Sequence, residues 1–81
     1  MNERGGAYGS FFELSATAQA IKLVLRTSAN WNALPPEVKE FADMNATKLA
    51  RIVTGNPLHE DSYVDIAGYA TLALRAVKGN K

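Results

Sequence analysis

The 81-residue sequence contains no cysteine and only three prolines. Without cysteine the chain forms neither disulfides nor thiolate metal sites, two common supports of very small folds. A chain of this length buries only about 60–65% of its unfolded surface, so a single hydrophobic core is marginally stable. We therefore expect self-association, as a homo-oligomer, to complete the fold.

The sequence also lacks an excess of charge and any long apolar run. Nine Lys and Arg residues against eight Asp and Glu residues leave a net charge of +1, so no basic field indicates nucleic-acid binding. No run approaches the roughly 20 apolar residues of a membrane-spanning helix, and Met1–Gly9 has no apolar segment typical of a signal peptide. We expect a cytoplasmic protein that binds neither membrane nor nucleic acid.

Helical periodicity is what the sequence does contain. We predict a flexible arm at residues 1–9 and a single helical domain at 10–81, with helices at about 11–27, 36–54 and 61–78. In each helix, apolar residues recur at the three- and four-residue spacing that places them on one side. Short connectors then favour an all-α, three-helix, bundle-like protomer.

Local signals support these limits. Ser10 and Glu13 have the spacing of a capping box. Gly55 is a common C-terminal stop, and Asp61 or Ser62 is the expected cap of the third helix. Gly68 in that helix costs about 1 kcal/mol relative to alanine, which suggests that another helix packs closely there.

Some apolar residues lie outside the main buried sides. Phe12 and Leu23 point away from the apolar side of the first helix, and Tyr69 and Leu72 belong to a second apolar strip on the third. Large apolar residues in such positions indicate a second contact surface. These four residues are the candidate interface.

Asp61 and Asp65 are the first residues that suggest chemistry. They are four residues apart on the third helix, so both carboxylates lie on one side of it. Paired carboxylates suit Mg²⁺, which commonly binds one or two of them together with phosphate oxygens. Lys48 and Arg51, three residues apart on the second helix, would contact the phosphates of a nucleotide. Glu13 is a candidate third metal ligand, although its capping role explains it as well.

The same residues fit a purely structural role. A half-buried Asp65 needs a partner, and Lys48 or Arg51 on the neighbouring helix would form an ordinary ion pair with it. Asp61 fits a helix cap. Asn45 interrupts the apolar stripe of the second helix, where a buried amide more often fixes register or an oligomer interface than takes part in catalysis.

Other chemistry finds little support. His59 is the only histidine and has no cysteine beside it, so a zinc site is not expected. The serines lack a base for a catalytic triad, and the glycines of RGGAYGS lack the Gly-Lys-Ser/Thr ending of a P-loop. A helix-turn-helix is disfavoured because neither the second nor the third helix has a basic outer side.

Three stretches, which together cover most of the chain from Arg4 to about Leu74, carry a family resemblance. They are RGGAYGSFFE, NWNALPPEVKEFADMNATKLARIVTGNP and DSYVDIAGYATLAL. They resemble a family of small, uncharacterised bacteriophage and prophage proteins that is distantly similar to the MazG-like all-α nucleotide pyrophosphohydrolases. The most specific part is KLAR followed, after a short Gly/Pro turn, by DxxxDIAGYA.

The resemblance implies an activity. MazG-like relatives hydrolyse nucleoside triphosphates to monophosphate and pyrophosphate, with Mg²⁺ held by acids on two helices of a dimer or tetramer. By resemblance, Asp61 and Asp65 match acids of the last helix, and Lys48 and Arg51 match a basic pair. Asp43 lies where similar sequences tend to carry an acid.

The sequence also departs from the MazG-like pattern. Its first helix offers only Glu13 in place of a pair of acids, and its third helix has DxxxD in place of ExxD. Gly9 and Asn45 stand where an acid and an aliphatic residue are expected. These departures are also consistent with a family member that does not hydrolyse nucleotides.

Two functions from different classes follow as hypotheses. The first is a Mg²⁺-dependent nucleotide pyrophosphohydrolase in the cytoplasm of the host cell. The second is a non-enzymatic, dimeric phage protein-interaction module that binds a host or defence factor. In the second, the surface is formed by Phe12, Leu23, Tyr69 and Leu72.

Overall fold

The structure is a computed structural model that describes residues 10–79. It contains three long helices, α1 (Phe11–Arg26), α2 (Pro36–Thr54) and α3 (Glu60–Val77), and a short 3₁₀ helix, η2 (Trp31–Ala33), in the first connector. All regular structure in residues 10–79 is helical, which confirms the predicted fold class. The long helices begin and end within one residue of the predicted limits. The arm predicted at 1–9 lies outside the described residues.

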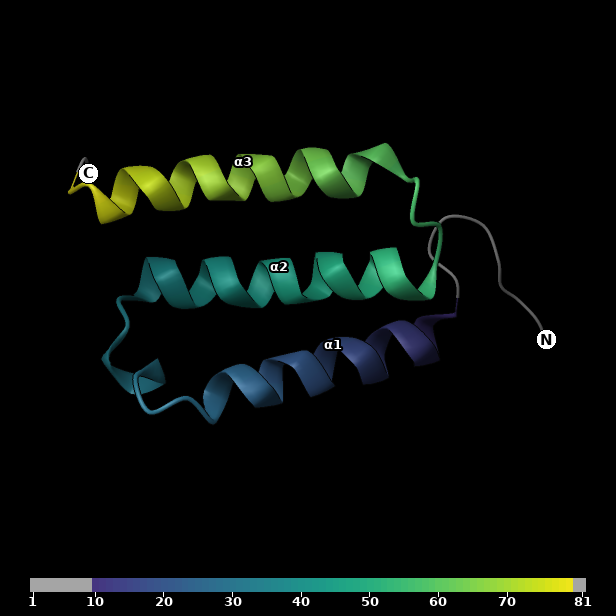
Figure 1. The fold of residues 1–81 in the computed structure, drawn as a ribbon, viewed down its shortest axis with the longest axis horizontal. Helices are drawn as coiled ribbons and strands as arrows, with labels where there is room; N and C mark the ends of the chain where they lie inside the picture. Colours follow the sequence, from purple (N-terminus) through teal and green to yellow (C-terminus); the bar gives the residue numbers. More distant parts are fainter. Residues whose placement is uncertain (1–9, 80–81) are drawn as a thin grey trace.

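The three long helices lie side by side in a flat layer measuring 46 × 27 × 13 Å, with α2 in the middle (Figure 1). α1 and α3 each pack along α2, on opposite sides of it. The layer therefore has two broad sides, and residues 10–79 contain no further long helix that covers either of them. This open arrangement decides which side chains remain accessible.

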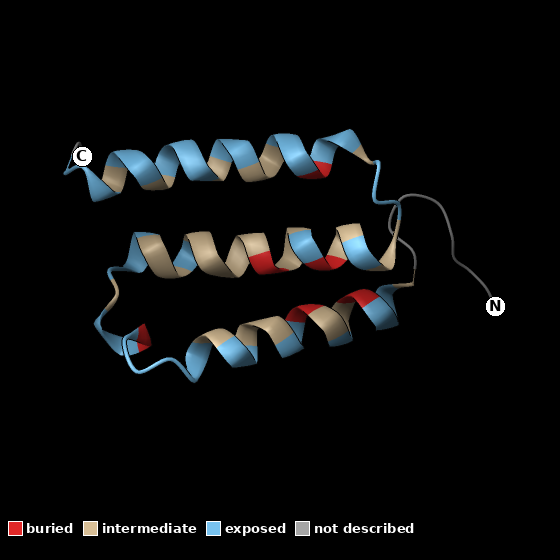
Figure 2. Cartoon of the chain, viewed as in Figure 1, coloured by how far each residue is buried: buried red, intermediate tan, exposed pale blue. Residues whose placement is uncertain are grey.

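The core is small because only the α1–α2 contact is well buried. Leu14 and Ala18 of α1 pack on Ala50 of α2, with Ile21 at the edge of this cluster. Most buried positions lie on α1 and α2. Trp31 of η2 and Ser62 near the start of α3 are also buried, and α3 is otherwise exposed over most of its surface (Figure 2). Among the described residues, no large side chain is completely buried.

The first connector is held by residues that the sequence patterns do not single out as a group. The Arg26 guanidinium lies 4.8 Å from the centre of the Trp31 ring, a cation–π distance. It also donates two hydrogen bonds to the Asp43 carboxylate, of 3.0 and 2.8 Å. These bonds raise the pKa of Arg26 above its ordinary value. Asp43, which the resemblance suggested as an acid position, thus joins α1 to α2.

The helix starts follow the predictions in one case and differ in another. The backbone N–H of Glu13 donates to the Ser10 side-chain oxygen over 3.2 Å, as expected of an N-cap. In contrast, α3 begins one residue earlier than predicted and has His59 at its N-cap position. Asp61 therefore lies within the first turn, and the prediction that Asp61 or Ser62 caps α3 is wrong.

Two further features concern the outside of the layer. A Cβ atom added at Gly68 would meet no atom within 4 Å, so the predicted close packing of another helix does not occur within the protomer. Of the helices in residues 10–79, none combines the length and apolarity needed to cross a membrane.

Candidate functional site

Lys48 and Asp65 form the centre of the candidate site. The Lys48 ammonium lies 2.7 Å from a carboxylate oxygen of Asp65, and the two side chains are 18% and 42% exposed. This contact joins α2 to α3 and shows that the predicted basic and acidic residues meet. An ion pair that is accessible on one side can serve as a structural link or as part of a ligand site.

Arg51 lies in the turn of α2 after Lys48, and Asp61 lies in the turn of α3 before Asp65. Because α2 and α3 run antiparallel, these two turns lie toward the same end of the layer (Figure 1). Asp61 is exposed and Arg51 is partly buried. We call Lys48, Arg51, Asp61 and Asp65 the charged cluster.

The predicted third metal ligand is not part of this cluster. Glu13 is on α1, which packs against the opposite side of α2 from α3. In residues 10–79, no three acidic, histidine or cysteine side chains are grouped so that they could hold a metal ion. The carboxylate in contact with Lys48 is that of Asp65, and Asp61 lies one turn before it on α3.

Asn45 lies one turn from Lys48 on α2, and its side-chain oxygen is buried with no hydrogen-bond partner in the described part of the chain. A buried acceptor without a partner costs roughly 1–3 kcal/mol. The sequence marked this residue as an interruption of the apolar stripe, and the structure places it close to the α2–α3 contact.

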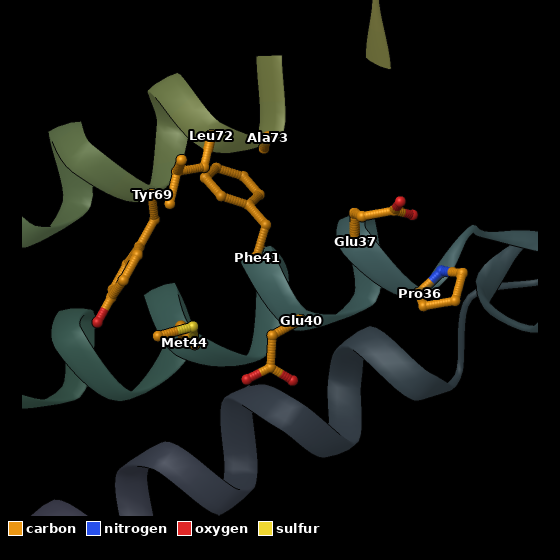
Figure 3. A pocket seen from close by; sticks show the side chains of 8 residues that line it. All are labelled: Pro36, Glu37, Glu40, Phe41, Met44, Tyr69, Leu72 and Ala73. Carbon is orange, nitrogen blue, oxygen red and sulfur yellow. The ribbon is translucent and has the colours of Figure 1, made fainter. Parts of the chain in front are cut away.

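A groove continues from the charged cluster along the same two helices. It has a volume of about 360 Å³ and is mainly apolar. Figure 3 shows the Phe41 ring extending from α2 toward Leu72, and the Tyr69 ring extending from α3 toward α2. The lining residues are Pro36, Glu37, Glu40, Phe41, Met44, Tyr69, Leu72 and Ala73.

The groove divides the predicted interface residues into two pairs. Tyr69 and Leu72 line the groove, whereas Phe12 and Leu23 lie on α1 and are 80% and 66% exposed. Phe41 and Met44 line the groove with the first pair, although the sequence patterns did not single them out as its partners. Met44, Lys48 and Arg51 share one side of α2 at spacings of four and three residues, and this signal could have extended the charged site along the helix.

The broad side of the layer away from the groove is apolar. α2 turns Ala46 and Ala50 toward α1 and Lys48 toward α3. One broad side of α2 lies about a quarter turn from the direction of α1 and a quarter turn from the direction of α3. The residues that project from this side are uncharged. They are Val38, Ala42, Leu49 and Val53.

α3 continues this apolar side. The side of α3 that carries Asp65 and the groove residues faces α2 and the groove. The residues on the other side of α3 project from the same broad side of the layer as the four residues of α2. They are Tyr63, Ile66, Ala70, Leu74 and Val77. We call this surface, with the four residues of α2, the apolar side of the layer.

A comparison with protein-family models matches residues 1–77 to a family described as Domain of unknown function (DUF6378). No curated protein and no solved structure matches the chain. The family description names no activity, so the geometry of α2 and α3 is what points to a function.

Proposed function

We propose that this chain, which belongs to the DUF6378 family, binds nucleoside triphosphates with Mg²⁺ and hydrolyses them to monophosphate and pyrophosphate. The observation that carries the proposal is the 2.7 Å contact between Lys48 and Asp65, with Asp61 one turn before Asp65 on the same side of α3. This contact supports the proposal because an ammonium group suited to phosphates lies beside a carboxylate suited to a cation. The MazG-like resemblance of the KLAR and DSYVDIAGYA segments points to the same chemistry.

The residues present fit a magnesium ion that is shared with phosphate. Mg²⁺ usually keeps several waters and takes only one or two carboxylates from the protein, with phosphate oxygens completing its shell. Asp61 and Asp65 would hold the ion, and they are accessible enough to do so. The ion would neutralise charge that develops on the phosphates and help to activate a water.

The basic residues differ in what they contribute. Lys48 provides a compact positive charge, whereas the planar guanidinium of Arg51 provides N–H donors suited to two phosphate oxygens. The Asp65 carboxylate neutralises the charge of Lys48. The same contact would orient the Lys48 ammonium toward a bound phosphate.

The test is pyrophosphate release from a panel of ribo- and deoxynucleoside triphosphates in the presence of Mg²⁺ or Mn²⁺. We expect Asp65→Ala to lower metal-dependent release by about 100-fold or more, the scale seen when one directed electrostatic contact is lost. Glu60→Ala is the matched control, because Glu60 is an exposed acid in the first turn of the same helix.

Circular dichroism separates the two roles of the ion pair. In the proposed function, Asp65→Ala keeps the helical signal and loses release. If the variant unfolds and the parent shows no metal-dependent release with any nucleotide, Lys48 and Asp65 form a structural ion pair only and the proposal fails.

We also propose that the protein functions as a homo-oligomer assembled through the apolar side of the layer. Val53 and Val77 on this surface are 70% and 69% exposed, and no part of the described protomer covers them. Water-exposed apolar area of this kind marks contact surfaces. A second copy would cover this apolar area, and the small core of each copy would gain stability from the association.

A non-enzymatic protein-interaction module is the second candidate. The observation that favours it is the exposure of Phe12 and Leu23, which are 80% and 66% accessible. Aromatic side chains such as Phe12 are enriched at protein interfaces, and exposed large apolar side chains that lie together mark contact surfaces. In this function the Lys48–Asp65 pair only holds α3 against α2.

A further inference from the structure

We infer that the groove between α2 and α3 is the subsite for the base of the nucleotide, an uncharged aromatic heterocycle. This inference rests on the proposed function, because the charged cluster must hold the phosphates of the same molecule. It extends that function by assigning the apolar half of the site, which neither the family match nor the charged residues describe.

The groove and the charged cluster are two ends of one surface. On α2, Met44 lines the groove and is followed one turn later by Lys48. On α3, Asp65 is followed one turn later by Tyr69, which also lines the groove. One turn of four residues is about 6 Å along a helix. The Lys48–Asp65 contact therefore marks the boundary between a charged end and an apolar end.

The apolar end has the size and chemistry of a small-molecule site. Its volume of about 360 Å³ falls in the range of roughly 300–1,000 Å³ typical of ligand pockets. Phe41 and Tyr69 provide aromatic faces, on which any base can stack. Met44 is a flexible apolar side chain that adapts to an irregular ring, and Leu72 closes the α3 side (Figure 3).

Charge fixes the direction of the ligand. Glu37 and Glu40 line the far part of the groove, and their carboxylates would repel a phosphate. Lys48 and Arg51 are at the opposite end. A molecule with negative charge at one end and a neutral aromatic ring at the other is therefore complementary to this surface in one orientation only.

Gly68 leaves room between the two ends. It follows Asp65 by three residues and precedes Leu72 by four, so all three lie on one side of α3. Apart from the adjoining backbone of α3 and the two neighbours of Gly68 in the chain, no atom of the described residues lies within 4 Å of the position that a Cβ would occupy. A ligand that spans the site would pass this open stretch of helix without meeting a side chain.

The experiment compares equilibrium binding, by calorimetry in the presence of Mg²⁺, of inorganic tripolyphosphate and of nucleoside triphosphate analogues. In these analogues a methylene group replaces the oxygen between the α- and β-phosphates, so that the ligand is not hydrolysed during the measurement. We expect the nucleotides to bind at least about tenfold more tightly, the scale of stacking a base on aromatic side chains. We expect Tyr69→Ala and Leu72→Ala to remove this difference and leave tripolyphosphate binding unchanged. Val64→Ala is the control, because Val64 is 64% exposed on the same helix and belongs neither to the groove lining nor to the apolar side.

The outcomes distinguish this inference from the function on which it rests. If nucleotides and tripolyphosphate bind equally, or if Leu72→Ala weakens both to the same extent, the base subsite is wrong and the phosphate site stands. If neither compound binds the parent protein, the proposed function fails and the base subsite fails with it. Since Leu72 is largely exposed, its truncation leaves the fold available for the measurement even where Tyr69→Ala does not.

Discussion

Gly68 shows how a single residue can mean different things in sequence and in structure. In the sequence, a glycine in mid-helix suggests that another helix approaches closely. In the structure, the space beside it is open, and the residue lies between the charged cluster and the groove. Its lack of a side chain is thus unexplained by packing within the protomer and agrees with a ligand passing along α3.

Gly68→Ala is expected to raise the free energy of unfolding by roughly 0.5–1 kcal/mol, because alanine loses less backbone entropy in a helix and its Cβ would meet no atom. Urea denaturation measures the change. Ala67→Gly, at an exposed neighbouring position, is the reciprocal control and should lower the free energy by a similar amount. A loss of stability in Gly68→Ala would show that a second copy packs against this point.

At the scale of elements, α1 has two very different sides. Leu14 and Ala18 on its inner side are buried against α2, whereas Phe12 and Leu23 on its outer side face water. The inner side explains why α1 is part of the fold. The outer side has no role in the described protomer and is the basis of the second candidate function.

The variants Phe12→Asp and Leu23→Asp are expected to keep the helical circular dichroism and to change the free energy of unfolding by about 0.5 kcal/mol or less, as exposed substitutions usually do. Leu14→Asp, which buries a charge in the core, should unfold the protein. In the second candidate function, the two outer variants also lose an assembly that light scattering detects in the parent. An unchanged mass would remove the outer side of α1 from any self-assembly.

The whole molecule is a layer about one helix thick. Its short dimension of 13 Å leaves no interior beyond the lines where neighbouring helices touch. A three-helix protein that closed on itself would bury residues from all three contacts, but here α1 and α3 are separated by α2. The apolar side of the layer is therefore a broad surface that is available to a second copy.

Val53→Asp tests this arrangement, because Val53 is 70% exposed on the central helix of the apolar side. Size-exclusion chromatography with light scattering should give a multiple of 8.8 kDa for the parent and the monomer mass for the variant. A charge that is buried within an apolar contact must be desolvated, which opposes association. Val64→Asp, on α3 and 64% exposed, is turned away from that side and should retain the parent mass.

The sequence alone determined the helices and the direction of several side chains. Ser10, Gly55 and the three- to four-residue apolar spacing give helix limits within one residue, because caps and periodicity depend on neighbours in the chain. The same periodicity placed Asp61 and Asp65 on one side of a helix, and the basic pair on the helix before it. Only the cap of α3 was misplaced, because neither Asp61 nor Ser62 stands at the N-cap position, which His59 occupies.

The tertiary structure decided which of these sides meet. The rotation and shift of α3 against α2 decide whether Lys48 contacts Asp65 and whether Tyr69 and Phe41 line one groove. This rotation and shift result from contacts between residues that are far apart in the chain. The order of helices in the layer likewise separates Glu13 from the acids of α3. Local periodicity fixes the sides of each helix, but only packing between helices fixes which sides face each other and which remain open.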